Sequence, residues 1–147
     1  MIKIKHRVNL IDDLKSLNLA FGAEVDIRSQ GSELIIHHEP FSNGELFESW
    51  IKFYKHKLLI LNVKEEGLED KLIDLMEKYK ISNYFFLDQS FPFMLKYSKS
   101  CKKRSAIRLS EYEDINTCLK VHKFCKWVWV DCFNKYQLDK KTYYLLK

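Results

Sequence analysis

The chain has 147 residues, of which 46% are hydrophobic, 31% charged and 14% aromatic, and its formal net charge is +5. This composition is sufficient for the core of one globular domain and excludes a disordered, collagenous or low-complexity chain. The longest apolar stretches, such as 58–61 and 84–87, are far shorter than the roughly 18 to 20 residues that span a bilayer. We therefore expect no integral membrane segment. The N-terminus is charged and has no apolar signal-peptide core, so we expect a cytoplasmic protein.

Short runs rich in Ile, Val, Leu, Phe and Trp alternate with segments of helical spacing along the chain. The predicted strands are 2–4, 23–27, 33–36, 58–63, 84–87, 106–109 and 127–130, and the predicted helices are 10–21, 46–54, 68–80, 91–98, 112–124 and 138–147. Gly31 lies between two extended runs, which predicts a hairpin over 28–33. Elsewhere the alternation is typical of βα units with a mainly parallel sheet. We expect a single α/β domain over 1–147.

Cysteine spacing and local charge argue against two kinds of site. Cys101, Cys118, Cys125 and Cys132 lack the paired spacing of a structural zinc site, so we interpret them as reduced thiols. A short basic cluster, Lys99, Lys102, Lys103 and Arg104, has no aromatic residues between its charges for base stacking. We interpret it as a solvated loop and expect no nucleic-acid partner. A third interpretation, a basic nucleic-acid-binding module, rests on the net charge of +5 alone.

Polar residues recur at the C-terminal ends of the predicted strands. Glu24 and Asp26 share one face of their strand by alternation, as do Asn62 and Lys64 of another. Further polar residues at strand ends are His6, Arg7, His37, His38, Glu39, Asp88, Arg108 and Asp131. In α/β sheets the carboxyl ends of parallel strands converge, and functional sites assemble there. The sequence therefore predicts a site at this edge, where two oxygen ligands two residues apart could share one ion.

Each of these residues also has a structural interpretation. Glu24 and Asp26 could face solvent on an edge strand, and Lys64 could belong to a charged strand exit. His37 and His38 are adjacent and must point to opposite sides of an extended chain, so at most one of them is expected to be functional. Arg108 and Asp131 could form a structural ion pair. The recurrence of acid, base and cation at nearly every strand end favours the functional interpretation.

Four segments carry a resemblance to a known family. They are His6-Arg7 after the first strand, Gly22-Ala-Glu-Val-Asp26, Ile36-His-His-Glu-Pro40 and Leu61-Asn-Val-Lys64. In these segments the sequence resembles the glycerophosphodiester phosphodiesterases, which are related in fold to phosphatidylinositol-specific phospholipase C. The resemblance implies a TIM-barrel-like (β/α) fold, of which this chain would hold about six of eight βα units. The sequence departs from the family at Val8, where the family has glycine, and at Asn62, where it has a metal-binding glutamate.

The resemblance implies a metal-dependent phosphodiesterase that acts on a small phosphodiester. Glu24, Asp26 and Asn62 would hold Ca²⁺ or Mg²⁺, which Asn62 would bind more weakly than glutamate. His6 and His38 would be the general acid and base, in an order that the sequence leaves open. Arg7 and Lys64 would hold the phosphoryl group. The alternative is a non-catalytic relative that binds a phosphorylated sugar or lipid head group.

An incomplete barrel would leave the strands 2–4 and 127–130 without neighbours. Unpaired strand edges invite association, so we expect them to be covered by the segment 138–147 or by a second copy in a homo-oligomer formed through open sheet edges. The other outcome is a chain that is unstable in isolation.

Overall fold

A computed structural model describes residues 1–98, 104–136 and 138–147. The chain divides into two compact units, Met1–Gln89 and Ser90–Lys147, and each is described by itself. A single domain over 1–147 stays a prediction. The expected basic cluster lies outside the described residues except for Arg104.

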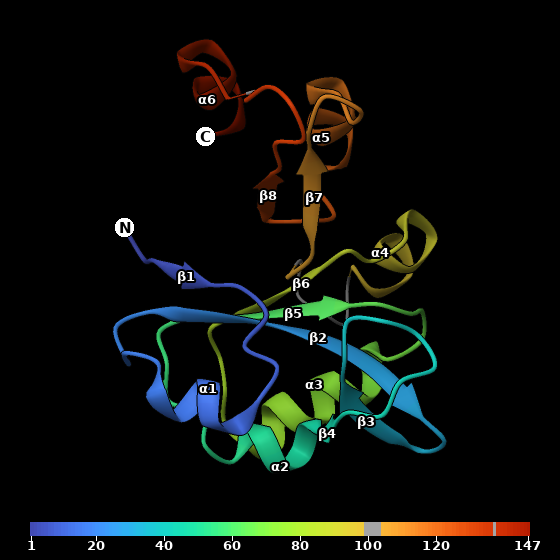
Figure 1. Cartoon of the computed structure of the whole chain (residues 1–147). Helices are drawn as coiled ribbons and strands as arrows, with labels where there is room; N and C mark the ends of the chain where they lie inside the picture. The colour runs from blue at the N-terminus through green and yellow to red at the C-terminus, as the bar shows by residue number, and fades with distance from the viewer. Residues whose placement is uncertain (99–103, 137) are drawn as a thin grey trace. The chain divides into compact units, whose positions relative to one another are not determined.

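Unit 1 is built on a six-stranded mixed sheet with three helices (Figure 1). Its strands are β1 (Ile4–Lys5), β2 (Gly22–Gln30), β3 (Glu33–Ile36), β4 (Glu45–Leu46), β5 (Leu59–Val63) and β6 (Tyr84–Leu87), and its helices are α1 (Ile11–Ser16), α2 (Phe47–Ile51) and α3 (Glu69–Lys78). The strand order is β4-β3-β2-β5-β6, and β1 pairs with β2. β1, β2, β5 and β6 pair in parallel, whereas β3 and β4 run antiparallel to their neighbours.

The central strand β2 has three partners. Ala23 is in register with both Lys5 of β1 and Leu59 of β5, while Ile27 is in register with both Ile36 of β3 and Val63 of β5. β1 and β3 therefore share the edge of β2 that β5 leaves open, at opposite ends of it. The segment after β1 fills the interval between them.

The predicted TIM-barrel-like fold is wrong. In the part of the chain that the structure describes, the sheet of unit 1 runs openly from β4 to β6 and is not closed into a barrel. The reason is local, because the turn at Gly31, whose φ of 60° favours glycine, sends β3 back along β2. The returning strand occupies an edge that a further parallel strand would need. The hairpin itself is confirmed.

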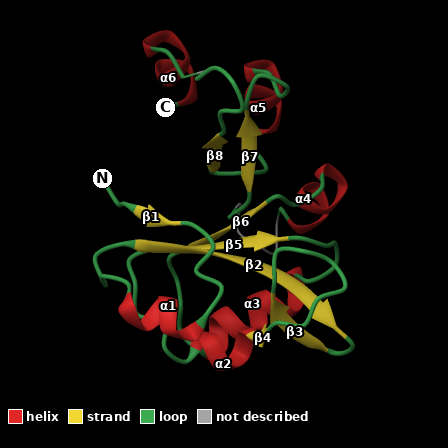
Figure 2. Cartoon of the chain, viewed as in Figure 1, coloured by secondary structure: helices red, strands yellow, loops and turns green. Residues whose placement is uncertain are grey.

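Helices α1, α2 and α3 cover one face of this sheet (Figure 2). α3 shows how the sequence produces that layer, because Leu72 and Met76 are four residues apart and both are buried. Phe47 and Trp50 of α2 are fully buried and stack on each other. Alternation along β2 places Val25 and Ile27 on one face of the sheet and Glu24 and Asp26 on the opposite face.

Unit 2 is a smaller α/β unit. It contains α4 (Phe91–Tyr97), β7 (Ala106–Leu109), α5 (Ile115–Val121), β8 (Trp127–Val130) and α6 (Lys140–Leu146). β7 and β8 pair in parallel, and α5 connects them as in a βαβ unit. A cluster of buried apolar side chains forms its core and includes Ile107, Leu109 and Cys118. The helices of both units, as far as they are described, are too short or too polar to span a membrane.

Candidate functional site

The candidate site of unit 1 lies at the carboxyl ends of β2 and β5, on the face that carries Glu24 and Asp26. Asp26 is in register with Asn62 of the neighbouring parallel strand, so both side chains lie on the same face. Glu24, Asp26 and Asn62 are all buried. β2 is paired on both edges, so the alternative of Glu24 and Asp26 as solvent-facing residues of an edge strand is wrong.

Asn62 joins the two carboxylates. Its Nδ2 donates to Glu24 Oε1 at 2.7 Å and to Asp26 Oδ1 at 3.1 Å. A buried carboxylate is costly unless it is hydrogen-bonded or paired with a cation, and one amide here serves both. Asn62 thereby fixes the spacing of the acidic pair.

The segment after β1 supplies donors to the other side of the pair. The backbone amide of Arg7 donates to Glu24 Oε2 at 2.6 Å. Asn9 acts twice on Asp26, since its Nδ2 donates to Asp26 Oδ2 at 2.8 Å and its Oδ1 accepts from the Asp26 backbone amide at 3.1 Å. Val8 N donates to the Glu24 carbonyl at 2.8 Å, which continues the pairing beyond β1. This segment therefore replaces a strand along β2 and orients both carboxylates.

Lys64 stands directly after β5 and faces two carboxylates. Its Nζ lies 3.4 Å from Asp26 Oδ1 and 3.3 Å from Asp88 Oδ2. The Lys64 side chain is only 15% exposed, so solvent screens these ion pairs less than those of a surface lysine. Asp88 follows β6 with a φ of 60°, and Arg7 has a φ of 53°. Such a backbone conformation is sparsely populated for residues other than glycine, and it is concentrated at functional sites.

His38 is held between a carboxylate and a guanidinium. Its Nδ1 lies 2.6 Å from Glu39 Oε1, and its Nε2 lies 3.2 Å from a terminal nitrogen of Arg7. Because a guanidinium can only donate, Nε2 accepts and the ring proton is on Nδ1, which donates to Glu39. The hydrogen bond from His38 is the largest cause that lowers the pKa of the Glu39 carboxyl below its ordinary value. The unprotonated nitrogen of His38 therefore faces the Arg7 guanidinium.

Arg28 fixes the position of His38 relative to β5. Its Nε and one terminal nitrogen donate to the His38 carbonyl at 3.1 Å and 2.9 Å. Its other terminal nitrogen donates to the Lys64 carbonyl at 3.2 Å. One planar side chain thus ties together the chain segments that carry the basic imidazole and the ammonium.

The predicted metal ligands do not fit a divalent cation as they are arranged. Each of the four carboxylate oxygens of Glu24 and Asp26 accepts from a protein donor, namely Asn62, Arg7 N, Lys64 or Asn9. No group of three or more His, Cys, Asp or Glu side chains in residues 1–98, 104–136 and 138–147 is arranged to hold a metal ion. The dependence on Ca²⁺ or Mg²⁺ stays a prediction.

Of the seven predicted site residues, six are joined by the contacts described above: Arg7, Glu24, Asp26, His38, Asn62 and Lys64. His6 is exposed and directly precedes Arg7. His37 hydrogen-bonds to the Glu39 backbone through Nδ1, whereas His38 contacts the Glu39 carboxylate, so the two adjacent histidines contact different groups of the same residue.

Two residues of the site were not predicted from the sequence pattern. Asn9 is not at a predicted strand end, and Arg28 follows the predicted strand 23–27 as the first residue of the hairpin, where nothing in its spacing indicates the contacts that it makes. Asp88 and Glu39 do follow predicted strands. The recurrence of polar residues at strand ends is the sequence signal by which Asp88 and Glu39 could have been predicted as site residues.

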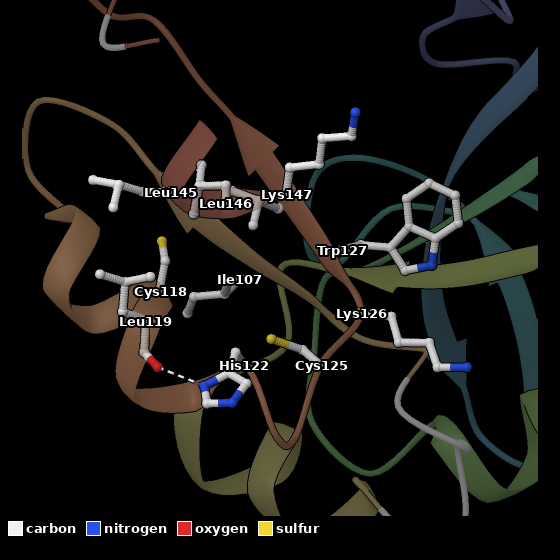
Figure 3. Close-up of a pocket in the computed structure, with 11 residues that line it drawn as sticks. Ile107, Cys118, Leu119, His122, Cys125, Lys126, Trp127, Leu145, Leu146 and Lys147 are labelled. Carbon is white, nitrogen blue, oxygen red and sulfur yellow. Dashed lines mark hydrogen bonds between the residues drawn. The ribbon is translucent and has the colours of Figure 1, made fainter. Parts of the chain in front are cut away.

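A concavity lies in unit 2, and its lining differs chemically from the candidate site of unit 1. Its volume is about 520 Å³, and its lining is formed by α5, β8 and α6 with Ile107 of β7 (Figure 3). Cys118 and Cys125 are among the lining residues, and burial raises the pKa of Cys118 to about 11 and raises that of Cys125. Both thiols are therefore protonated near neutral pH and are not activated nucleophiles.

Comparison with known proteins gives no family for this chain. A scan against models of protein families, a search of curated proteins and a search of solved structures each found no match. The resemblance to the glycerophosphodiester phosphodiesterases stays a prediction, and the function is argued from the site.

Proposed function

We propose that unit 1 hydrolyses a small phosphodiester, with His38 as the general base. The observation that carries this proposal is the orientation of the His38 ring, which directs Nε2 toward Arg7 while Glu39 holds Nδ1–H. A carboxylate on one ring nitrogen and an unprotonated second nitrogen is the arrangement in which imidazole accepts a proton from a nucleophile, once Arg7 has left that nitrogen.

The cations at the site suit an anionic substrate. Arg7 is exposed and its fork of donors matches two phosphoryl oxygens, and Lys64 adds a second positive charge. A phosphate that engages Arg7 withdraws the guanidinium from His38 Nε2. Substrate binding then leaves His38 Nε2 free to accept a proton.

Two imidazoles carry out the proton transfers of the proposed reaction. His38 Nε2 takes a proton from water while the water oxygen forms a bond to phosphorus. The bond from phosphorus to the ester oxygen breaks, and the departing alkoxide takes a proton from His6 in its imidazolium form. Proton exchange with solvent then restores both rings, and the products are a phosphate monoester and an alcohol. Fixed positive charge at Arg7 and Lys64 stabilises the charge that develops on the phosphoryl oxygens.

The test uses the adjacent histidines as a matched pair. We expect the purified chain to hydrolyse bis(4-nitrophenyl) phosphate or a glycerophosphodiester, and His38→Gln to lower the rate by a factor of about 10² to 10⁴. His37→Gln is the control, because His37 contacts the Glu39 backbone instead of the site, and its rate should stay within about threefold of the wild type. Equal losses in the two variants, or no turnover by the folded wild type, would refute the proposal.

A second function is favoured by one contact. Arg7 already occupies the basic nitrogen of His38, which is the arrangement of a site that binds a phosphate ester and does not cleave it. Under this alternative, a phosphomonoester or diester would raise the melting temperature in an Arg7-dependent manner without any turnover. Turnover that is lost in His38→Gln would remove it.

A further inference from the structure

The Asn62 side chain occupies the place between Glu24 and Asp26 where a shared cation would have to sit. Its Nδ2 is 2.7 Å from Glu24 Oε1 and 3.1 Å from Asp26 Oδ1. We propose that the Asn62 amide and the Lys64 ammonium replace a divalent cation, so that this site binds and uses none. The inference concerns the cofactor and holds whether or not a phosphodiester is the substrate.

The hydrogen bonds around the carboxylates are the first argument. Each of the two oxygens that face Asn62 accepts from its Nδ2, and Asp26 Oδ1 is also 3.4 Å from Lys64 Nζ. The two outer oxygens accept from the Arg7 amide and from Asn9. A cation that bound here would have to displace protein donors from buried carboxylates. Each displaced donor would then need a new partner.

The orientation of the amide is the second argument. Ligation by Asn62 would require its Oδ1 to face the carboxylates, whereas Oδ1 is buried with no hydrogen-bond partner and Nδ2 is directed at them. The opposite orientation would set three oxygen atoms against one another with no proton between them. The donor orientation is therefore the stable one while no cation is bound. A metal ion would have to reverse it and lose both hydrogen bonds.

The charges give the third argument. Lys64 supplies one fixed positive charge at the pair and is shared with Asp88. A divalent ion placed between Glu24 and Asp26 would lie close to this ammonium, and like charges at short range in a buried site repel strongly. Glu24, Asp26 and the side chain at position 62 would bind a divalent cation only if a third carboxylate replaced the Asn62 amide.

The test compares metal binding by the wild type and by Asn62→Asp, which exchanges the amide for a carboxylate of the same size. Calorimetric titration with CaCl2, MgCl2 or MnCl2 after treatment with chelator should give no saturable binding to the wild type. Its melting temperature should not respond to about 10 mM metal. Asn62→Asp should acquire saturable binding, with a rise in melting temperature of roughly 5 °C at the same concentration.

The outcomes separate the possibilities without an activity assay. Saturable binding to the wild type that Asp26→Asn abolishes would overturn the proposal. A folded Asn62→Asp variant that gains no binding would also overturn it, since the amide would then not stand at a cation position. If Asn62→Asp folds only when metal is added, that rescue supports the proposal, and if it does not fold at all the titration of the wild type decides.

Discussion

Replacing Asn62 by leucine should destabilise unit 1 because the acidic pair loses its shared donor. Leucine has the same number and branching of side-chain heavy atoms as asparagine but donates no hydrogen bond, so the Glu24 and Asp26 oxygens that faced the amide lose it as a donor. A hydrogen bond to a charged group contributes about 1.5 to 3 kcal/mol. Two such bonds amount to about 3 to 6 kcal/mol, and Lys64 offsets part of the loss at Asp26. We expect a loss of about 3 to 4 kcal/mol.

The measurement needs a probe that reports unit 1 alone. Of the three tryptophans, Trp50 is fully buried in unit 1, whereas Trp127 and Trp129 belong to unit 2. Urea unfolding followed by the fluorescence of Trp50, with Trp127 and Trp129 replaced by phenylalanine in every variant, gives the free energy of unfolding from the midpoint and slope.

Asn43→Leu is the matched control for this substitution. Asn43 is exposed and its side chain accepts one neutral hydrogen bond, from Gln30 at 2.8 Å, so its loss should change stability by no more than about 0.5 kcal/mol. A loss for Asn62→Leu that equals the loss for Asn43→Leu would refute the reasoning, because the amide would then not hold the carboxylate pair.

Three further predictions concern other parts of the chain. Gly44→Ala should destabilise unit 1 by about 1 to 3 kcal/mol in the same urea assay, because an added Cβ would meet the backbone carbonyl of β3. Backbone amides of residues 133–135 lower the pKa of Glu111 to about 2. These hydrogen bonds therefore contribute fully to stability above the ordinary pKa of a glutamate carboxyl, and their contribution is lost as the pH falls through about 2. An NMR titration of the Glu111 carboxyl should show this lowered pKa, and Glu111→Gln should abolish the pH dependence. Iodoacetamide at pH 7.5 should alkylate the exposed Cys132 before Cys118 or Cys125, because burial raises the pKa of the latter two thiols. Peptide mass spectrometry gives the order of alkylation, and earlier reaction of the buried thiols would contradict this prediction.

The positions of most elements follow from the sequence pattern. The structure confirms 33–36, 84–87, 106–109 and 127–130 as strands with the predicted bounds. Apart from Glu33 and Arg108, these runs are β-branched, aromatic or aliphatic, and a charged or polar residue follows each, so both their type and their limits are local properties. The predicted helices exist but are shorter, as with 10–21, where only Ile11–Ser16 is helical. Helix ends depend on packing and capping, which periodicity does not encode.

The topology of unit 1 could not be derived in the same way. Alternation of strands and helices favours parallel pairing, and the hairpin at Gly31 was the only local sign of an antiparallel partner. β4 is two residues long, and β1 continues as a segment that pairs through the side chain of Asn9. Neither feature has a hydrophobic period, so an open mixed sheet could not be distinguished from part of a barrel.

The candidate site was predictable in its acidic and basic members and not in the residues that hold them. Glu24, Asp26 and Asn62 are recognisable because polar residues within buried runs are unusual. Arg28 orients His38 through backbone carbonyls, and such contacts require knowledge of which chain segments meet. The role of Asn62 as a hydrogen-bond donor, and not a metal ligand, also depends on its register with Asp26 across two strands.

The most direct test of the central claim is a ³¹P NMR time course of a glycerophosphodiester with the purified chain in excess EDTA. The account predicts that the diester signal declines while a monoester signal grows, that His37→Gln preserves this rate, and that His38→Gln abolishes it. A diester signal that stays unchanged in the presence of the folded wild type, or one that declines equally with His38→Gln, would contradict the account.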